Sequence, residues 1–186
     1  MRVTKEPEVR KQEILDTALK LFGENGYEKT SITDIAKAIG VAQGLCYRYF
    51  PSKAALFDSA IEQYADVLVE QFVCSGKDDQ KTLRQIIEDM PATMEQRDTK
   101  YYSVFHGAEN KKFHDQLYLK VCEKLVPLVE KLLLRARQKD EIQFDDIQAA
   151  AMFCVYGQLG ILLADDLTQE DKSKRIREFL IFALHL

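Results

Sequence analysis

Residues 31–50 read SITDIAKAIGVAQGLCYRYF, and this stretch decides the fold of the N-terminal part of the chain. Ser31 followed three positions later by Asp34 is a capping-box pattern, which begins a helix. Gly40 breaks that helix, and a second short helix is expected to end near Phe50. Two short helices joined by a glycine-containing turn are typical of the helix-turn-helix geometry.

Longer helices are expected on both sides of this motif. Before it, apolar residues recur at three- and four-residue steps up to Phe22, and Gly23 and Gly26 end the helix. After it, Pro51 cannot continue the short helix, and a new helix is predicted over residues 52–73. The N-terminal segment therefore predicts three helices followed by a longer one.

The rest of the chain also reads as helix, with Pro91 and Pro127 as points of interruption. Asp145 is the expected N-cap of one of these helices. The expected segments cover about 83–94, a short helix within 98–112, 113–138, 145–164, and a last helix capped by Thr168 or Asp171. The predicted fold class is all-α with about nine helices. We expect a three-helix DNA-binding head over 1–55, with its helix-turn-helix at 31–50, and a larger helical body over 56–186.

Composition excludes several classes of protein. The chain has 186 residues, 46% hydrophobic and 30% charged, so it can bury a core and is neither disordered nor collagen-like. Eight Gly and four Pro are too few for an all-β protein rich in tight turns. The longest apolar stretch, 149–164, is shorter than the ~20 residues that a membrane span needs.

Cysteine spacing and the N-terminus bear on metals and compartment. The four cysteines are 28, 48 and 32 positions apart, so no pair has zinc-knuckle or redox spacing; they are Cys46, Cys74, Cys122 and Cys154. No apolar run follows Met1, so no signal peptide is expected. We expect a cytoplasmic protein with free thiols, and neither a metal nor a cofactor.

Charge is distributed unevenly along the chain. Residues 1–55 carry nine Lys/Arg and seven Asp/Glu, a net charge of +2, whereas the rest carries 17 basic and 23 acidic residues. A basic head could meet phosphate, while an acidic body would repel it. A net charge of +2 also fits ordinary scatter, so charge alone leaves the question open.

The second helix of the motif carries side chains suited to reading DNA. Gln can pair with adenine, and Arg with guanine, in the major groove, which gives Gln43 and Arg48 a role. Tyr hydroxyls and Lys53 suit phosphate oxygens, which fix register rather than sequence. Thr30 and Ser31 lie at a helix N-terminus, where a phosphate could dock.

At these residues the sequence resembles a known family. Residues 8 to about 60 resemble the N-terminal domain of TetR-type transcriptional regulators. The similarity is carried by the Ile14–Phe22 spacing, Gly26-Tyr27, Thr30-Ser31-Ile32, Ile35-Ala36, Gly40-Val41, Gly44, Tyr47-x-Tyr49-Phe50 and Ser52-Lys53-x-x-Leu56. The resemblance implies that the short third helix enters the major groove. It assigns DNA contacts to Thr30, Ser31, Gln43, Gly44, Leu45, Tyr47, Arg48, Tyr49 and Lys53.

Two residues depart from the family pattern, and several residues of the motif also allow an interpretation other than DNA contact. Leu45 replaces a small hydroxyl residue and could press on a thymine methyl group. Cys46 replaces a larger aliphatic residue; we favour a core role for it over redox sensing. Phe50 is also interpreted as core. Arg48 fits a base contact or a solvated charge equally well.

The body is expected to hold the dimer interface. The helix over 145–164 is apolar nearly all round, and the last helix ends in an apolar run, so a body this small cannot easily cover both. A monomer with two core helices is the less favoured alternative. Pairing of these helices across a two-fold axis into a four-helix bundle would bury them, as the resemblance also implies. The expected interface residues are Phe153, Gly157, Gly160, Ile161, Phe179 and Phe182.

A pocket for an apolar or aromatic small molecule is expected between the central helices, because TetR-like bodies usually hold one. The candidate lining residues are Met90, Met94, Tyr101, Tyr102, Phe105, His106, Phe113, Tyr118, Met152 and Tyr156. Aromatic and Met residues at helical spacing also fit an ordinary core. His106 and His114 could be a polar handle or a metal pair, although solvated histidines are favoured.

These features predict a homodimeric, ligand-responsive transcriptional regulator that binds a palindromic double-stranded operator, and the resemblance implies that it is a repressor released by a small ligand. A helical adaptor that uses the head for protein contacts is the alternative, and steep salt dependence of binding would separate the two. An enzyme is disfavoured, because the sequence has no G-x-S-x-G, phosphate-cradling glycine loop or H-E-x-x-H motif.

Overall fold

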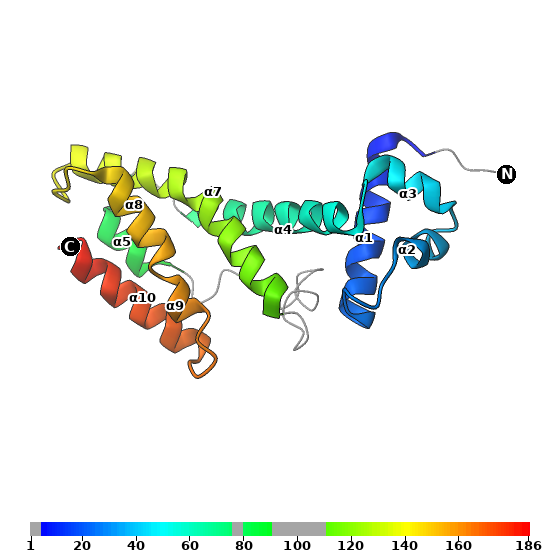
Figure 1. The fold of residues 1–186 in the computed structure, drawn as a ribbon. Helices are drawn as coiled ribbons and strands as arrows, with labels where there is room; N and C mark the ends of the chain where they lie inside the picture. Colours follow the sequence, from blue (N-terminus) through cyan, green and yellow to red (C-terminus); the bar gives the residue numbers. More distant parts are fainter. Residues whose placement is uncertain (1–4, 76–79, 91–110) are drawn as a thin grey trace. The chain divides into compact units, whose positions relative to one another are not determined.

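The computed structural model describes residues 5–75, 80–90 and 111–186, which contain helices, turns and loops but no strand (Figure 1). The all-α prediction is confirmed for these residues. Two compact units divide the chain. The first contains Met1–Tyr64 and Arg97–Leu117, and the second contains Ala65–Gln96 and Tyr118–Leu186. The first unit is thus larger than the head of residues 1–55, whose functional boundary stays a prediction.

The first unit is built on α1 (Pro7–Asn25), α2 (Ile32–Ala38), α3 (Gln43–Tyr49) and the start of α4 (Lys53–Ser75). One stripe of α1 is buried, as its three- and four-residue spacing predicts; it consists of Ile14, Leu15, Ala18, Leu19 and Phe22. α2 packs against both α1 and α3. The three helices of the head therefore share one core.

The turn between α2 and α3 has a sharp geometry that glycine permits. Gly40 has a φ of +69°, its N–H donates to the Lys37 carbonyl, and the N–H of Val41 donates to the Ala36 carbonyl. This pair of bonds is a Schellman motif, which ends a helix and satisfies its last carbonyls. The expected helix break at Gly40 is confirmed.

The second unit contains α5 (Leu83–Glu88), most of α7 (Lys111–Gln138), α8 (Ile147–Tyr156), α9 (Leu159–Leu162) and α10 (Gln169–Ala183). In Figure 1 the axis of α7 changes direction along the helix, as expected for a helix that continues through Pro127. One core joins the elements of this unit; its buried members are Leu83, Ile87, Leu133, Ala136, Ile142, Ile147, Ala151, Ile176, Leu180 and Leu184.

The short helix α5 is held at both ends by charged side chains from elsewhere in the second unit. The N–H of Leu83, its first residue, donates to the Glu141 carboxylate at 2.6 Å. At the other end, the Arg177 guanidinium of α10 donates to the Met90 carbonyl at 2.9 Å. An acidic group at the N-terminus of a helix and a basic group at its C-terminus both interact favourably with the helix dipole. Sequence reasoning missed both contacts, because they join residues 58 and 87 positions apart.

The structure corrects the helix that was expected to run from 145 to 164. α8 ends at Tyr156, and α9 begins only at Leu159. A Cβ atom at Gly157 would lie 2.5 Å from the Phe153 carbonyl oxygen, so only glycine fits this backbone. The Gln158 side-chain amide donates to the Cys154 carbonyl, which the N–H of residue 158 would bind in a continuous helix.

Two smaller corrections concern where helices begin and end. The N-cap of α8 is Asp146, whose carboxylate accepts from the Ala149 N–H, rather than Asp145. The helix expected over 83–94 ends at Glu88, and the short helix expected within 98–112 falls mostly outside the described residues. Thr168 is confirmed as the N-cap of α10.

Candidate nucleic-acid interface

α3 has one buried face and one exposed face. Cys46 and Phe50, four positions apart, are buried in the core of the head, which confirms the core role expected for both. Burial also raises the pKa of the Cys46 thiol, so this cysteine is not a reactive thiolate. The opposite face of α3 is left free to meet a partner.

The exposed face carries the side chains that the sequence assigned to DNA. Gln43, Gly44, Arg48 and Tyr47 are exposed, Tyr47 to 46%, whereas Leu45 and Tyr49 are half-buried beside them. A Cβ atom built at Gly44 would meet no atom within 4 Å. The fold therefore does not require a glycine there, and the missing side chain leaves room for a close approach to α3.

Thr30 requires a correction. Its side chain is only 2% exposed, and its hydroxyl donates to the Gly26 carbonyl at 2.9 Å and to the Leu21 carbonyl at 3.2 Å. Its backbone N–H donates to the Tyr27 carbonyl at 3.2 Å. Since both donors are used inside the head, Thr30 joins α1 to the turn before α2 instead of facing a phosphate.

Ser31 and Asp34 form the capping box expected from the sequence. The Ser31 hydroxyl and N–H both donate to the Asp34 carboxylate, at 2.6 and 3.0 Å. In turn, the Asp34 N–H donates to the Ser31 hydroxyl oxygen. The hydrogen bond from the Ser31 side chain, followed by that from its backbone, lowers the pKa of Asp34. A phosphate at Ser31 would have to take these donors from Asp34.

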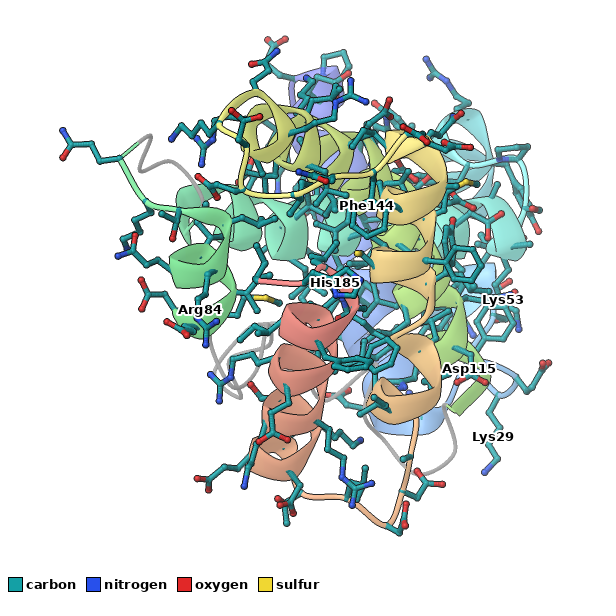
Figure 2. All side chains as sticks on the ribbon, turned by 90° about the vertical axis from the view of Figure 1, so that its left-hand side faces the viewer. Lys29, Lys53, Arg84, Asp115, Phe144 and His185 are labelled. Atoms are coloured by element: carbon teal, nitrogen blue, oxygen red, sulfur yellow. The ribbon has the colours of Figure 1, made fainter. Side chains whose placement is uncertain are left out.

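Lys53, the first residue of α4, contacts the turn before α2. Its ammonium donates to the Tyr27 carbonyl at 3.0 Å and lies 4.2 Å from the centroid of the Tyr27 ring. A weaker contact of 3.5 Å reaches the Glu28 carbonyl. Figure 2 labels Lys53 together with Lys29, whose exposed side chain extends away from the ribbon.

Three of the expected dimer residues are exposed phenylalanines on α8 and α10, two helices of the second unit that share its core. Phe153 is 80% exposed, and on α10 Phe179 is 60% and Phe182 is 75% exposed. Gly157 and Gly160 are also exposed, but they lie at and beyond the end of α8. Ile161 is half-buried and packs against the core, and its part in an interface stays a prediction.

The expected pocket is described only in part. Met94, Tyr101, Tyr102, Phe105 and His106 lie outside the described residues, as does the side chain of Phe113. Met90, Tyr118 and Tyr156 are half-buried, and burial raises the pKa of Tyr156. Met152 is 47% exposed next to Phe153, and its part in a pocket stays a prediction.

The described part of the chain shows neither a metal site nor a membrane-spanning helix. Within it, no three His, Cys, Asp or Glu side chains gather to form a metal site. His114 is half-buried on α7, whereas His106, the other member of the expected histidine pair, lies outside the described residues. No described helix combines the length and hydropathy needed to cross a membrane.

Comparison with known proteins agrees with this geometry. Residues 14–60 match the family model described as "Bacterial regulatory proteins, tetR family". The HTH-type transcriptional regulator YuxN of Bacillus subtilis is 49% identical over 53 residues, which are 28% of this chain and 18% of YuxN. The HTH-type transcriptional repressor KstR2 of Rhodococcus jostii is 36% identical over 81 residues, 42% of this chain and 40% of KstR2. The chain thus spans less than half the length of these curated relatives.

The similarity of fold extends over nearly the whole chain. GusR of Salmonella enterica superposes with a TM-score of 0.65 and covers 98% of both chains at 23% sequence identity. At that identity the likeness shows the fold alone. Sequence similarity is therefore concentrated in the head, and the body shares an architecture with its structural relatives.

Proposed function

We propose that the chain is a sequence-specific DNA-binding transcriptional regulator of the tetR family, which is supported by the match of residues 14–60 to that family's model. The observation that carries the proposal is the exposed face of α3. The side chains of Tyr47 and Arg48 are exposed to a partner, whereas Cys46 and Phe50 on the opposite side are buried in the core. A helix presented in this way fits the major groove.

Each exposed side chain of α3 has a defined role in this proposal. Gln43 pairs with an adenine and Arg48 with a guanine, each through two hydrogen bonds. Leu45 contacts a thymine methyl group, and Gly44 lets the helix backbone approach the base edges. The Tyr47 hydroxyl donates a hydrogen bond to a phosphate, or the side chain contacts a base. Tyr49 is half-buried and reaches only the sugar–phosphate backbone of the duplex.

We propose that the protein binds DNA as a homodimer through α8 and α10. Phe153, Phe179 and Phe182 are exposed on helices whose other faces form the core of the second unit, so they have no cover within the described chain. Burying one such side chain contributes about 1.5–3 kcal/mol. Large exposed apolar side chains on neighbouring helices are typical of an interface. A two-fold dimer would match a palindromic operator.

We further propose that the regulator is a repressor, released from its operator by a small apolar or aromatic ligand bound in the second unit. The ligand would select a conformation of the dimer in which the two heads no longer fit successive major grooves. Support for this part is the family, together with half-buried Met90, Tyr118 and Tyr156 in the described part of that unit.

The test is selection of duplexes from random DNA by the purified protein. We expect one palindromic sequence to be enriched, and enrichment to be lost in Tyr47→Ala. Leu119→Ala, which removes a 48% exposed side chain of α7 in the second unit, is the control and should select the same sequence. No enrichment by the folded wild type, with and without candidate ligands, would contradict DNA readout and favour a protein-binding role.

A further inference from the structure

The turn that precedes α2 is held by one side chain from far along the sequence. The ammonium of Lys53 bonds the Tyr27 carbonyl at 3.0 Å and lies over the ring of the same residue at 4.2 Å. Lys53 therefore contacts both the main chain and the side chain of Tyr27. A cation over an aromatic face contributes about 0.5–1 kcal/mol at an exposed site and more when water is excluded.

The Tyr27 ring is itself fixed by two buried neighbours. Its centroid lies 5.2 Å from that of Phe22 on α1 and 5.2 Å from that of Phe57 on α4. Phe22 and Phe57 contact each other at 5.9 Å, edge to face. Burial raises the pKa of Tyr27. These tilted and edge-to-face contacts are the preferred arrangement of aromatic rings. The Tyr27 ring that lies under the Lys53 ammonium is therefore held in a fixed position.

The turn leads directly into the DNA-facing part of the head. Three residues after Tyr27, the Thr30 hydroxyl ties the turn to Gly26 and Leu21, and Ser31 then caps α2. Because α2 packs on α3, the position of the turn helps to set the position of α3. The motif residues Gly26, Tyr27, Thr30 and Lys53 therefore form one connected structure.

We propose that Lys53 is a positioning residue of the DNA interface. Its ammonium holds the turn before α2, and through α2 the exposed face of α3, in the orientation that DNA requires. A lysine ammonium has three N–H donors, and the carbonyls of Tyr27 and Glu28 lie within 3.0 and 3.5 Å of it. The inference rests on the proposed DNA binding and replaces the phosphate contact expected for this lysine.

The salt dependence of DNA binding separates positioning from phosphate contact. Each phosphate neutralised by a protein cation contributes about −0.9 to the slope of log K against log salt. Lys53→Met should weaken operator binding about tenfold, the scale of one lost hydrogen bond to a charged group, with no change in slope. If Lys53 instead neutralised a phosphate, the slope of Lys53→Met would be shallower than that of the wild type by about one.

A second pair of variants leaves the charge unchanged. Tyr27→Leu removes the ring under the ammonium and should weaken binding in the same way as Lys53→Met, again with an unchanged slope. Tyr27→Phe keeps the ring and should bind like the wild type. If Lys53→Met does not fold, as judged by far-UV circular dichroism, this pair decides the question.

Amide hydrogen exchange supplies a readout without DNA. We expect the amides of residues 27–32 to exchange faster in Lys53→Met than in Lys29→Met, which removes an exposed lysine from the same turn. A loss of about one unit of slope in Lys53→Met, wild-type affinity in that variant, or unchanged exchange would each overturn the positioning role. A wild type that binds no duplex would refute the proposed function instead, and the exchange data would still decide the role of Lys53.

Discussion

The buried hydroxyl of Thr30 allows a direct test of the correction to its role. Replacing Thr30 with Val keeps the shape of the side chain and exchanges its hydroxyl for a methyl group. The change removes the single O–H donor of Thr30, whose oxygen lies 2.9 Å from the Gly26 carbonyl oxygen and 3.2 Å from the Leu21 carbonyl oxygen. A buried polar group left without its partner costs about 1–3 kcal/mol, and the longer of the two bonds contributes little, so we expect a loss of about 1–2 kcal/mol.

The assay is thermal and urea unfolding of the full-length chain, followed by far-UV circular dichroism because the protein has no Trp. In a chain of this length, a loss of 1–2 kcal/mol lowers the melting temperature by about 2–8 °C. Thr33→Val is the matched control, because it makes the same chemical change at a partly exposed position of α2. Its stability should stay within about 0.5 kcal/mol of the wild type.

Two results would refute the reasoning about Thr30. The first is a Thr30→Val protein as stable as the wild type, since the hydroxyl would then contribute nothing inside the head. The second is a weaker operator complex with a reduced salt slope and unchanged stability. That combination would return Thr30 to the phosphate contacts.

The remaining predictions address the dimer, α5 and the capping box. Phe153→Glu should leave the fold intact, because the side chain is 80% exposed, but sedimentation should show monomers; an unchanged mass would exclude α8 from the interface. Glu141→Gln and Arg177→Met should each cost about 0.5–1 kcal/mol by removing a charge from an end of α5, and faster amide exchange confined to α5 would show it. The hydrogen bonds from Ser31 hold the folded pKa of Asp34 below its value in the unfolded chain, so its stabilising contribution is complete above the unfolded pKa and is lost as the pH falls through the folded pKa. The difference in urea midpoint between the wild type and Asp34→Asn should therefore shrink in acid, and a constant difference from pH 7 to pH 2 would contradict this.

Local signals in the sequence were sufficient for the head. The stripe ending at Phe22, the capping box at Ser31 and the break at Gly40 all involve residues within a few positions of one another. Periodicity and capping are local rules, so they predict helices and their ends well. The exposed face of α3 followed from the same rules once Cys46 and Phe50 were assigned to the core.

Contacts between distant residues were beyond sequence reasoning. Lys53 reads as a cation suited to phosphate, and only the fold shows that the Tyr27 carbonyl lies 3.0 Å away. Thr30 similarly reads as a helix-start hydroxyl until its bond to Leu21 is seen. In the body, apolar composition could not predict that Met152 is exposed, because a helix that is apolar all round has no polar face to mark its orientation.

The end of α8 at Tyr156 determines what kind of seam two copies of the chain could form. In an unbroken helix, positions 153, 157 and 160 would lie in one row, and the row could extend into a heptad repeat. The ladder of hydrogen bonds is interrupted at Gln158, whose side-chain amide takes the Cys154 carbonyl, so Phe153 is the one member of this row that lies on α8 itself. α8 has ten residues and is about 15 Å long at 1.5 Å per residue. Helices that meet over so short a length touch at a crossing point, where the shape of a few aromatic side chains, rather than a repeating register, sets the angle.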